Sequence, residues 1–329
     1  MHSDTIDIDP DFYTMEKAYG EDDWKSYQSL KSEDYWSPSD ELQFEAYETG
    51  HIIFLLLDYH RNNPLHRALV KPKHVLDVGT GKGSWAIDMA DMYPDATVRG
   101  VDLYPPPDTW IPPNCVFEVD DLLQPWTWTD KFDLIYLRHM LGSFDWDGWA
   151  TLYNNCYENL EPGGWIEQFE FNIQVFSDDK SLPQDTILSQ WADIWHPVSE
   201  RAGRPFQVQD KMRSSLERAG FVEIQEKVYK VPVGPWARDP VLKELGLLHN
   251  QHWATGLEGY CMWLLTTFGL PTPWSPEEVQ VFLAKTRSEL KNPAFHGYQY
   301  GRRIWARKPR EDEIKKQVLD TPIKREPSP

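Results

Sequence analysis

The pattern of apolar and polar segments between residues 70 and 170 predicts strands and helices in alternation. Short apolar runs, typical of strands buried on both faces, occupy residues 75–78, 97–103, 115–122 and 132–140, and another begins at about Trp165. After the first run, SWAIDMADMYP spaces its apolar residues as a mostly buried helix does. This order predicts an α/β domain built on a parallel sheet.

The chain after residue 170 predicts further helices and two more strands. Helical stretches fill much of 171–220, and helices are predicted at 239–269 and 275–291. The segments 221–234 and 298–309 have the composition and alternation of strands. No apolar run approaches the roughly 18 residues that a membrane-spanning helix needs, so we expect no membrane association.

Three glycines directly follow the first predicted strand, in VLDVGTGKGSW at residues 75–85. Gly79, Gly81 and Gly83 permit backbone conformations that a Cβ atom disfavours, and they let a ligand approach the main chain. The helix that follows offers unpaired N–H groups to an anion. Asp102 ends the second strand 19 residues after Gly83, where doubly wound sheets carry a ribose-binding carboxylate. A ligand with a ribose is therefore predicted.

The motifs together resemble the class I S-adenosylmethionine (SAM)-dependent methyltransferases, and the wider pattern resembles the fungal LaeA-like methyltransferases. The segments that carry the resemblance are VLDVGTGKGSWAIDMADMYP, VDL, PPNCVFEVDDLLQPW, FDLIYLRHMLGS and LEPGGWIEQFE. It implies a Rossmann-like, seven-stranded sheet with helices on both faces, an antiparallel last strand and an added helical lid. The methyltransferase domain is expected at 39–309, between an acidic, partly disordered arm at 1–38 and a disordered tail at 310–329.

The resemblance also implies which residues bind SAM. Asp77 is expected to hold the amino group, and the three glycines to pass under the methionine part. Asp102 is expected to accept both ribose hydroxyls. Asp120 is expected to bind the adenine amino group, with a backbone contact from Asp121 or Leu122. Arg138 and His139 end the fourth strand and are expected to touch SAM or the acceptor, or else to brace a loop.

The sequence does not identify the catalytic residues. Methyl transfer requires that the acceptor atom, the methyl carbon and the sulfur are aligned and that water is excluded. It requires no metal, and it requires a base only when the acceptor atom must lose a proton. By residue type, the candidate bases are His139, His196, His249 and His252. His51 belongs to a helix that is expected to cover SAM. Glu167 and Glu170 either face the cleft or brace the sheet. Five tryptophans either line the acceptor pocket or pack the lid helices: Trp191, Trp195, Trp236, Trp253 and Trp263.

The charge of the chain limits the classes of partner it can bind, and its cysteine content limits the cellular compartment in which we expect it. Residues 1–50 hold 14 Asp or Glu and 3 Lys, a net of −11 out of −19 for the whole chain. Such acidity argues against direct nucleic-acid binding and leaves a basic protein as an electrostatically compatible partner. Cys115, Cys156 and Cys261 are far apart, and no signal peptide is recognisable, so we expect a cytoplasmic or nuclear protein.

We therefore expect a SAM-dependent methyltransferase that acts on a small-molecule acceptor in fungal secondary metabolism. The alternative is a LaeA-like nuclear regulator of secondary metabolism or development that acts through partner proteins. A third hypothesis is a scaffold that binds SAM and turns over little of it.

Overall fold

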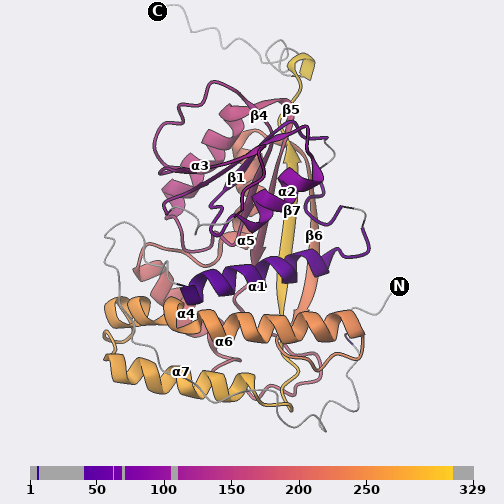
Figure 1. Cartoon of the computed structure of the whole chain (residues 1–329). Helices are drawn as coiled ribbons and strands as arrows, with labels where there is room; N and C mark the ends of the chain where they lie inside the picture. The colour runs from indigo at the N-terminus through magenta and orange to yellow at the C-terminus, as the bar shows by residue number, and fades with distance from the viewer. Residues whose placement is uncertain (1–5, 7–40, 62, 69–70, 105–109, 314–329) are drawn as a thin grey trace, which may run out of the picture.

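A computed structural model describes residues 6, 41–61, 63–68, 71–104 and 110–313 (Figure 1). The predicted acidic arm, apart from Ile6, lies outside the described residues, as does most of the predicted tail. Residues 310–313 continue the folded part of the chain. There the Glu313 carboxylate accepts hydrogen bonds from Arg307 and from the backbone N–H of Arg310.

Seven strands form one sheet in the order β3-β2-β1-β4-β5-β7-β6. Strands β1 to β5 pair in parallel with their neighbours, and β7 runs antiparallel to both β5 and β6. The predicted seven-stranded sheet with an antiparallel last strand is confirmed. The strands are β1 His74–Val78, β2 Thr97–Asp102, β3 Cys115–Val119, β4 Phe132–Arg138, β5 Leu160–Phe171, β6 Val222–Pro232 and β7 Tyr298–Arg307.

Helices cover both faces of the sheet because the central strands bury apolar side chains on both sides. On β1, Val75 packs with helices α1 (Glu41–Leu57) and α2 (Ser84–Met92). Its neighbour Leu76 points to the other face, where it packs with α3 (Trp146–Asn159) and α5 (Val208–Ala219). This two-sided burial is what the continuous apolar runs predict.

Three further helices form a layer with its own apolar core beyond the carboxyl ends of the parallel strands (Figure 1). They are α4 (Trp191–Arg201), α6 (Pro240–Phe268) and α7 (Pro276–Leu290). The Asp239 carboxylate caps α6, and Ser275 forms a capping box at the start of α7. Helix α6 also packs along α1, which joins this layer to the sheet. The predicted helical lid is confirmed. None of the described helices combines the length and apolar character that crossing a membrane requires.

The fifth strand begins at Leu160, five residues before the predicted start at Trp165. Phe132 of β4 pairs with Leu160, whereas Leu134 pairs with Trp165, so the Pro-Gly-Gly segment forms a bulge within the strand. Gly163, with φ +87°, supplies the backbone conformation that the bulge needs. The third strand ends at Val119, which leaves Asp120 and Asp121 in the loop that follows.

Candidate active site

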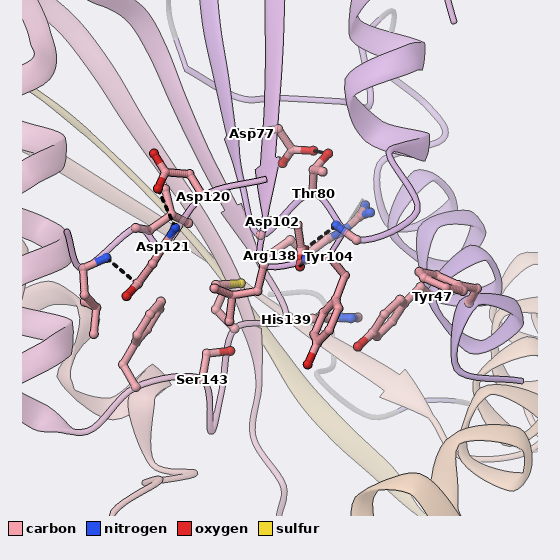
Figure 2. Close-up of a pocket in the computed structure, with 18 of the residues that line it drawn as sticks. Tyr47, Asp77, Thr80, Asp102, Tyr104, Asp120, Asp121, Arg138, His139 and Ser143 are labelled. Carbon is pink, nitrogen blue, oxygen red and sulfur yellow. Dashed lines mark hydrogen bonds between the residues drawn. The ribbon is translucent and has the colours of Figure 1, made fainter. Parts of the chain in front are cut away.

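A pocket of about 350 Å³ opens at the carboxyl ends of β1, β2 and β4 (Figure 2). This is where the strand order reverses between β1 and β4, the usual ligand position in such sheets. The pocket brings together most of the predicted site residues: Asp77, Gly79, Gly81, Asp102, Asp120, Asp121, Arg138 and His139. It does not bring Gly83, His196 or His252 to its wall.

The glycine loop lies against the pocket with its backbone in left-handed conformations. Gly79 has φ +67°, and a Cβ atom there would overlap the sulfur of Met140. Gly81 has φ +55°, and its N–H donates to Asp102 Oδ2 over 2.8 Å. Gly83 is the N-cap residue that precedes α2 and has φ +84°, and a Cβ there would overlap the ring of Phe117. Packing against Phe117 and against Met140 leaves no room for a side chain at Gly83 and Gly79, and of the three glycines Gly79 and Gly81 line the pocket.

Asp102 lies at the end of β2 with both carboxylate oxygens directed at the loops around the pocket. Oδ2 accepts the Gly81 N–H, and Oδ1 accepts the Tyr104 N–H over 3.3 Å. Burial raises the pKa of this carboxyl, and these backbone donors oppose the rise. Each carboxylate oxygen has a second lone pair, so the group can still accept hydroxyl donors such as those of a ribose.

Asp77 is the most deeply buried carboxyl of the pocket. The Thr80 hydroxyl donates to its Oδ2 over 2.6 Å (Figure 2). Burial raises the pKa of Asp77 to about 7, although the Thr80 hydrogen bond and the Arg138 charge both act to lower it. A cation placed beside Asp77 would therefore stabilise its charged form.

Arg138 ends β4 and brings a guanidinium group to the pocket wall. Its Nη1 donates to Nδ1 of His51 over 3.0 Å, and Nε2 of His51 lies 2.8 Å from Asp88 Oδ2. His51 of α1 thus lies behind Arg138, between it and α2. Sequence reasoning missed Asp88, because only the packing of α1 on α2 brings residues 51 and 88 together.

The two carboxylates after β3 have different surroundings. Asp121 accepts hydrogen bonds from the N–H of Leu123 and from the side chain of Gln124, one on each oxygen. Asp120 accepts the Asp121 N–H on Oδ1, and among the described residues Oδ2 accepts none. Asp120 is the better placed of the two to accept from a ligand amino group.

Among the four histidines that are candidate bases by residue type, His139 is the one on the pocket wall. Its backbone has φ +53°, which is uncommon for a residue with a Cβ. Its Nε2 is buried and has no hydrogen-bond partner in the described part of the chain. Desolvation lowers the pKa of His139 well below its ordinary value, so the ring is neutral at neutral pH. His252 donates Nδ1–H to the carbonyl of Ala46, and His196 belongs to α4.

The two glutamates of β5 brace loops and do not line the pocket. Glu170 accepts the N–H groups of Met140 and Leu141, which fixes the loop after β4. Glu167 accepts the N–H groups of Arg67 and Ala68. Burial raises the pKa of Glu170 to about 7, against the lowering effect of these hydrogen bonds and one from Gln168.

None of the five candidate tryptophans lines the pocket. Trp191, Trp195 and Trp253 pack in the core of the helical layer. Trp236 packs with Ala237 and Tyr298 in a separate cluster, and Trp263 is exposed. Other aromatic residues line the pocket, and sequence reasoning did not single them out: Phe44, Tyr47, Tyr104 and Phe144. Each of these residues is distant from the glycines in sequence, so the sequence does not indicate that it lies close to them in space.

Comparison with known proteins assigns the chain to a family. A family model described as a methyltransferase domain matches residues 57–226. The chain is 37% identical to the secondary metabolism regulator LAE1 of Cochliobolus heterostrophus, over 84% of this chain and 91% of that protein. It is 31% identical to the methyltransferase pytC of Aspergillus terreus, over 90% of this chain and 91% of that protein. It is also 31% identical to the protein-methionine methyltransferase laeA of Emericella nidulans, over 88% of this chain and 77% of that protein.

The pocket fits the cofactor of such enzymes. SAM carries an ammonium, a carboxylate, a ribose and an adenine, and the wall offers a buried carboxyl, a guanidinium and further carboxylates to these groups. The family match covers more than half of the chain, and three relatives align over most of it. The chain belongs to the LaeA-like family of class I methyltransferases, enzymes whose cofactor is S-adenosylmethionine.

Proposed function

We propose that this enzyme transfers the methyl group of SAM to a small-molecule acceptor of fungal secondary metabolism. The observation that carries the proposal is the pocket itself, where the glycine loop, Asp102 and Arg138 meet aromatic side chains. Aromatic walls suit a planar or apolar acceptor. The LAE1 relative is named a secondary metabolism regulator, which supports the metabolic role, and pytC is named a methyltransferase, which supports the methyl transfer. We propose the cytoplasm or the nucleus as its compartment.

The proposed roles of the wall residues follow from charge and hydrogen-bonding capacity. Asp77 holds the ammonium of SAM, and Arg138 holds its carboxylate. Asp102 accepts the ribose hydroxyls, and Asp120 accepts the adenine amino group, beside the backbone of Asp121. Bound SAM supplies a methyl group on a positively charged sulfur. The chain supplies alignment of the acceptor with that methyl group and excludes water from it.

His139 is the proposed proton acceptor for acceptors that must lose a proton. Bound SAM would supply the methyl group and leave as S-adenosylhomocysteine, and neutral His139 would take the proton of the acceptor oxygen or nitrogen. The imidazole on the pocket wall is neutral and so can accept a proton at neutral pH, but its lowered pKa makes it a weaker base than an exposed histidine.

Calorimetric titration of SAM into the full-length protein tests the proposal. We expect micromolar binding by the wild type and by Asp95→Ala, an exposed control. We expect no measurable binding by Asp102→Ala, which removes the ribose contact. Absence of binding by the wild type would overturn the proposal of an active enzyme.

A protein methionine is a second candidate acceptor. The relative from Emericella nidulans is named a protein-methionine methyltransferase. In this chain Met140 lines the pocket, with its sulfur against Gly79. A thioether carries no proton, so transfer to it would need no base. Mass spectrometry of peptides after incubation with SAM would detect a methyl group on Met140, and Met140→Leu is the control.

The third candidate is a regulator that acts through partner proteins; the LAE1 relative is named a secondary metabolism regulator, which supports the regulatory role. It predicts that the wild type binds SAM, while small aromatic acceptors and Met140 both stay unmethylated. Turnover of a small acceptor that Asp102→Ala abolishes would favour the enzyme over the regulator.

A further inference from the structure

We propose that His51 is a positioning residue that holds Arg138 ready for the carboxylate of SAM. The inference rests on the proposed cofactor roles above and adds to them the group that fixes Arg138. Arg138 is held from behind by α1, so its guanidinium is oriented before the ligand arrives.

The hydrogen bonds between these side chains define their direction. A guanidinium can only donate, so Nδ1 of His51 must be the acceptor of the bond from Arg138. The neutral ring then carries its proton on Nε2, which donates to Asp88 Oδ2 over 2.8 Å. The chain Arg138–His51–Asp88 therefore requires one tautomer of an uncharged histidine.

The surroundings of His51 favour that uncharged form. The residue is 6% exposed. Burial lowers the pKa of His51, as does the Arg138 charge, whereas Asp88 and Glu48 raise it. The charged groups that face it are Arg138 from β4, Asp88 from α2 and Glu48 from α1 itself. Glu48 in turn pairs with Lys82 of the glycine loop.

Helix α1 restrains Arg138 at a second point. The guanidinium carbon lies 4.9 Å from the ring centre of Phe54, one turn along the helix from His51. In the described part of the chain, His51 is the one side chain that shares a hydrogen bond with Arg138. An arginine held by one bond and one ring keeps its remaining N–H donors for the pocket.

This restraint matters because the pocket wall is rich in carboxyl groups. Asp77, Asp102, Asp120 and Asp121 all line it, and each opposes the entry of a ligand carboxylate. A freely rotating Arg138 would offset that opposition less, because ordering a long side chain costs conformational entropy. Holding the guanidinium in advance removes that cost from binding.

The experiment compares SAM with 5′-methylthioadenosine, which keeps the adenine, ribose and thioether and lacks the amino-acid part. We expect His51→Leu to weaken SAM binding about 10-fold, the size of a hydrogen bond to a charged group. Binding of 5′-methylthioadenosine should be unchanged. His51→Gln offers an acceptor and a donor without titrating, so it should stay within about 3-fold of the wild type. His74→Leu, an exposed histidine, is the matched control.

A double-mutant cycle separates positioning from direct contact. Arg138→Met should weaken SAM binding, and His51→Leu should then add nothing in the double variant. Thermal unfolding of every variant checks that the fold is retained. Additive losses, equal losses for both ligands, or wild-type affinity in His51→Leu would overturn the inference. Failure of the wild type to bind either ligand would instead overturn the proposed function.

Discussion

In the loop after β1, side chains that pack against single glycines leave no room for a larger residue at those positions. Gly83 has φ +84°, and Phe117 fills the space that its Cβ would occupy. Gly203 has a similar φ of +65°, and no atom lies within 4 Å of the place where its Cβ would be, which makes it a control for backbone strain alone. The pair separates the cost of a left-handed backbone from the cost of a steric overlap.

We expect Gly203→Ala to lower the free energy of unfolding by about 1 kcal/mol, from backbone strain alone. Gly83→Ala should lower it by about 2–4 kcal/mol, since strain and displacement of the Phe117 ring add. Urea denaturation measures both. Equal losses would mean that Phe117 moves aside at no cost.

The buried carboxyl of Asp77 is expected to destabilise the ligand-free protein at alkaline pH. Its pKa is raised from 3.8 to about 7, so between these values the folded state keeps a proton that the unfolded state releases. The contribution of this group to stability therefore falls as pH rises through that window. We expect Asp77→Asn to raise the free energy of unfolding at pH 8 by at most about 4 kcal/mol and to change it little at pH 4.

The same substitution should weaken SAM binding at least about 10-fold, because it removes the charge opposite the ammonium. Denaturation at the two pH values and a SAM titration measure both effects. A variant with wild-type pH dependence would show that Asp77 is not the group responsible.

At the scale of elements, a buried ion cluster joins the end of α1 to β5, β6 and β7. Arg303 of β7 is fully buried and lies 3.1 Å from Asp58 and 3.6 Å from Glu167. Arg67 and Tyr229 also hydrogen-bond Asp58. Burial alone would raise the pKa of Asp58, but these donors and the nearby charges lower it to about 2. Its contribution to stability is thus present above pH 3.8 and lost as pH falls toward 2.

We expect Arg303→Met to lower the free energy of unfolding by about 3–5 kcal/mol, because two buried carboxylates lose a partner. Adding Glu167→Gln to that variant should recover part of the loss, since one of the uncompensated charges is removed. Chemical denaturation at pH 7 measures all three proteins. A double variant no more stable than Arg303→Met would place the whole loss on Asp58 or on packing.

At the scale of the whole molecule, α1 connects the helical layer to the cofactor pocket. It packs along α6 on one side, and Phe44, Tyr47 and His51 reach toward the pocket or its supports on the other. Binding in the pocket should therefore stabilise the sheet and the helical layer together.

At 100 times its dissociation constant, SAM should raise the free energy of unfolding by about 2.7 kcal/mol. Thermal unfolding with and without SAM measures the effect, and Asp102→Ala should show no shift. Hydrogen exchange should slow in α1 as well as in the glycine loop. Slowing in the loop alone would contradict the coupling through α1.

The local pattern of the chain was enough to predict the elements that carry most of the pocket wall. Apolar runs buried on both faces predicted the parallel strands, and glycines at 79 and 81 predicted the loop, because both signals depend on neighbouring residues only. Asp102 followed from its place at the end of the second strand, whereas Asp77 was expected from the resemblance to methyltransferases. The early start of β5 escaped prediction, since Gly163 and its neighbours have the composition of a turn, and only pairing with β4 makes them a bulge.

Contacts between distant segments were decided by the tertiary structure alone. The Arg138–His51–Asp88 chain, the aromatic wall of the pocket and the burial of Arg303 each need helices or strands from separate parts of the sequence to meet. The tryptophans of the helical layer show the same limit, because an aromatic residue packs equally well into a core or a pocket wall until the packing of α4, α6 and α7 is known. The sequence determined the glycine loop, because its conformation depends on local sterics, whereas the tertiary structure determined which charged side chains face the pocket beside that loop.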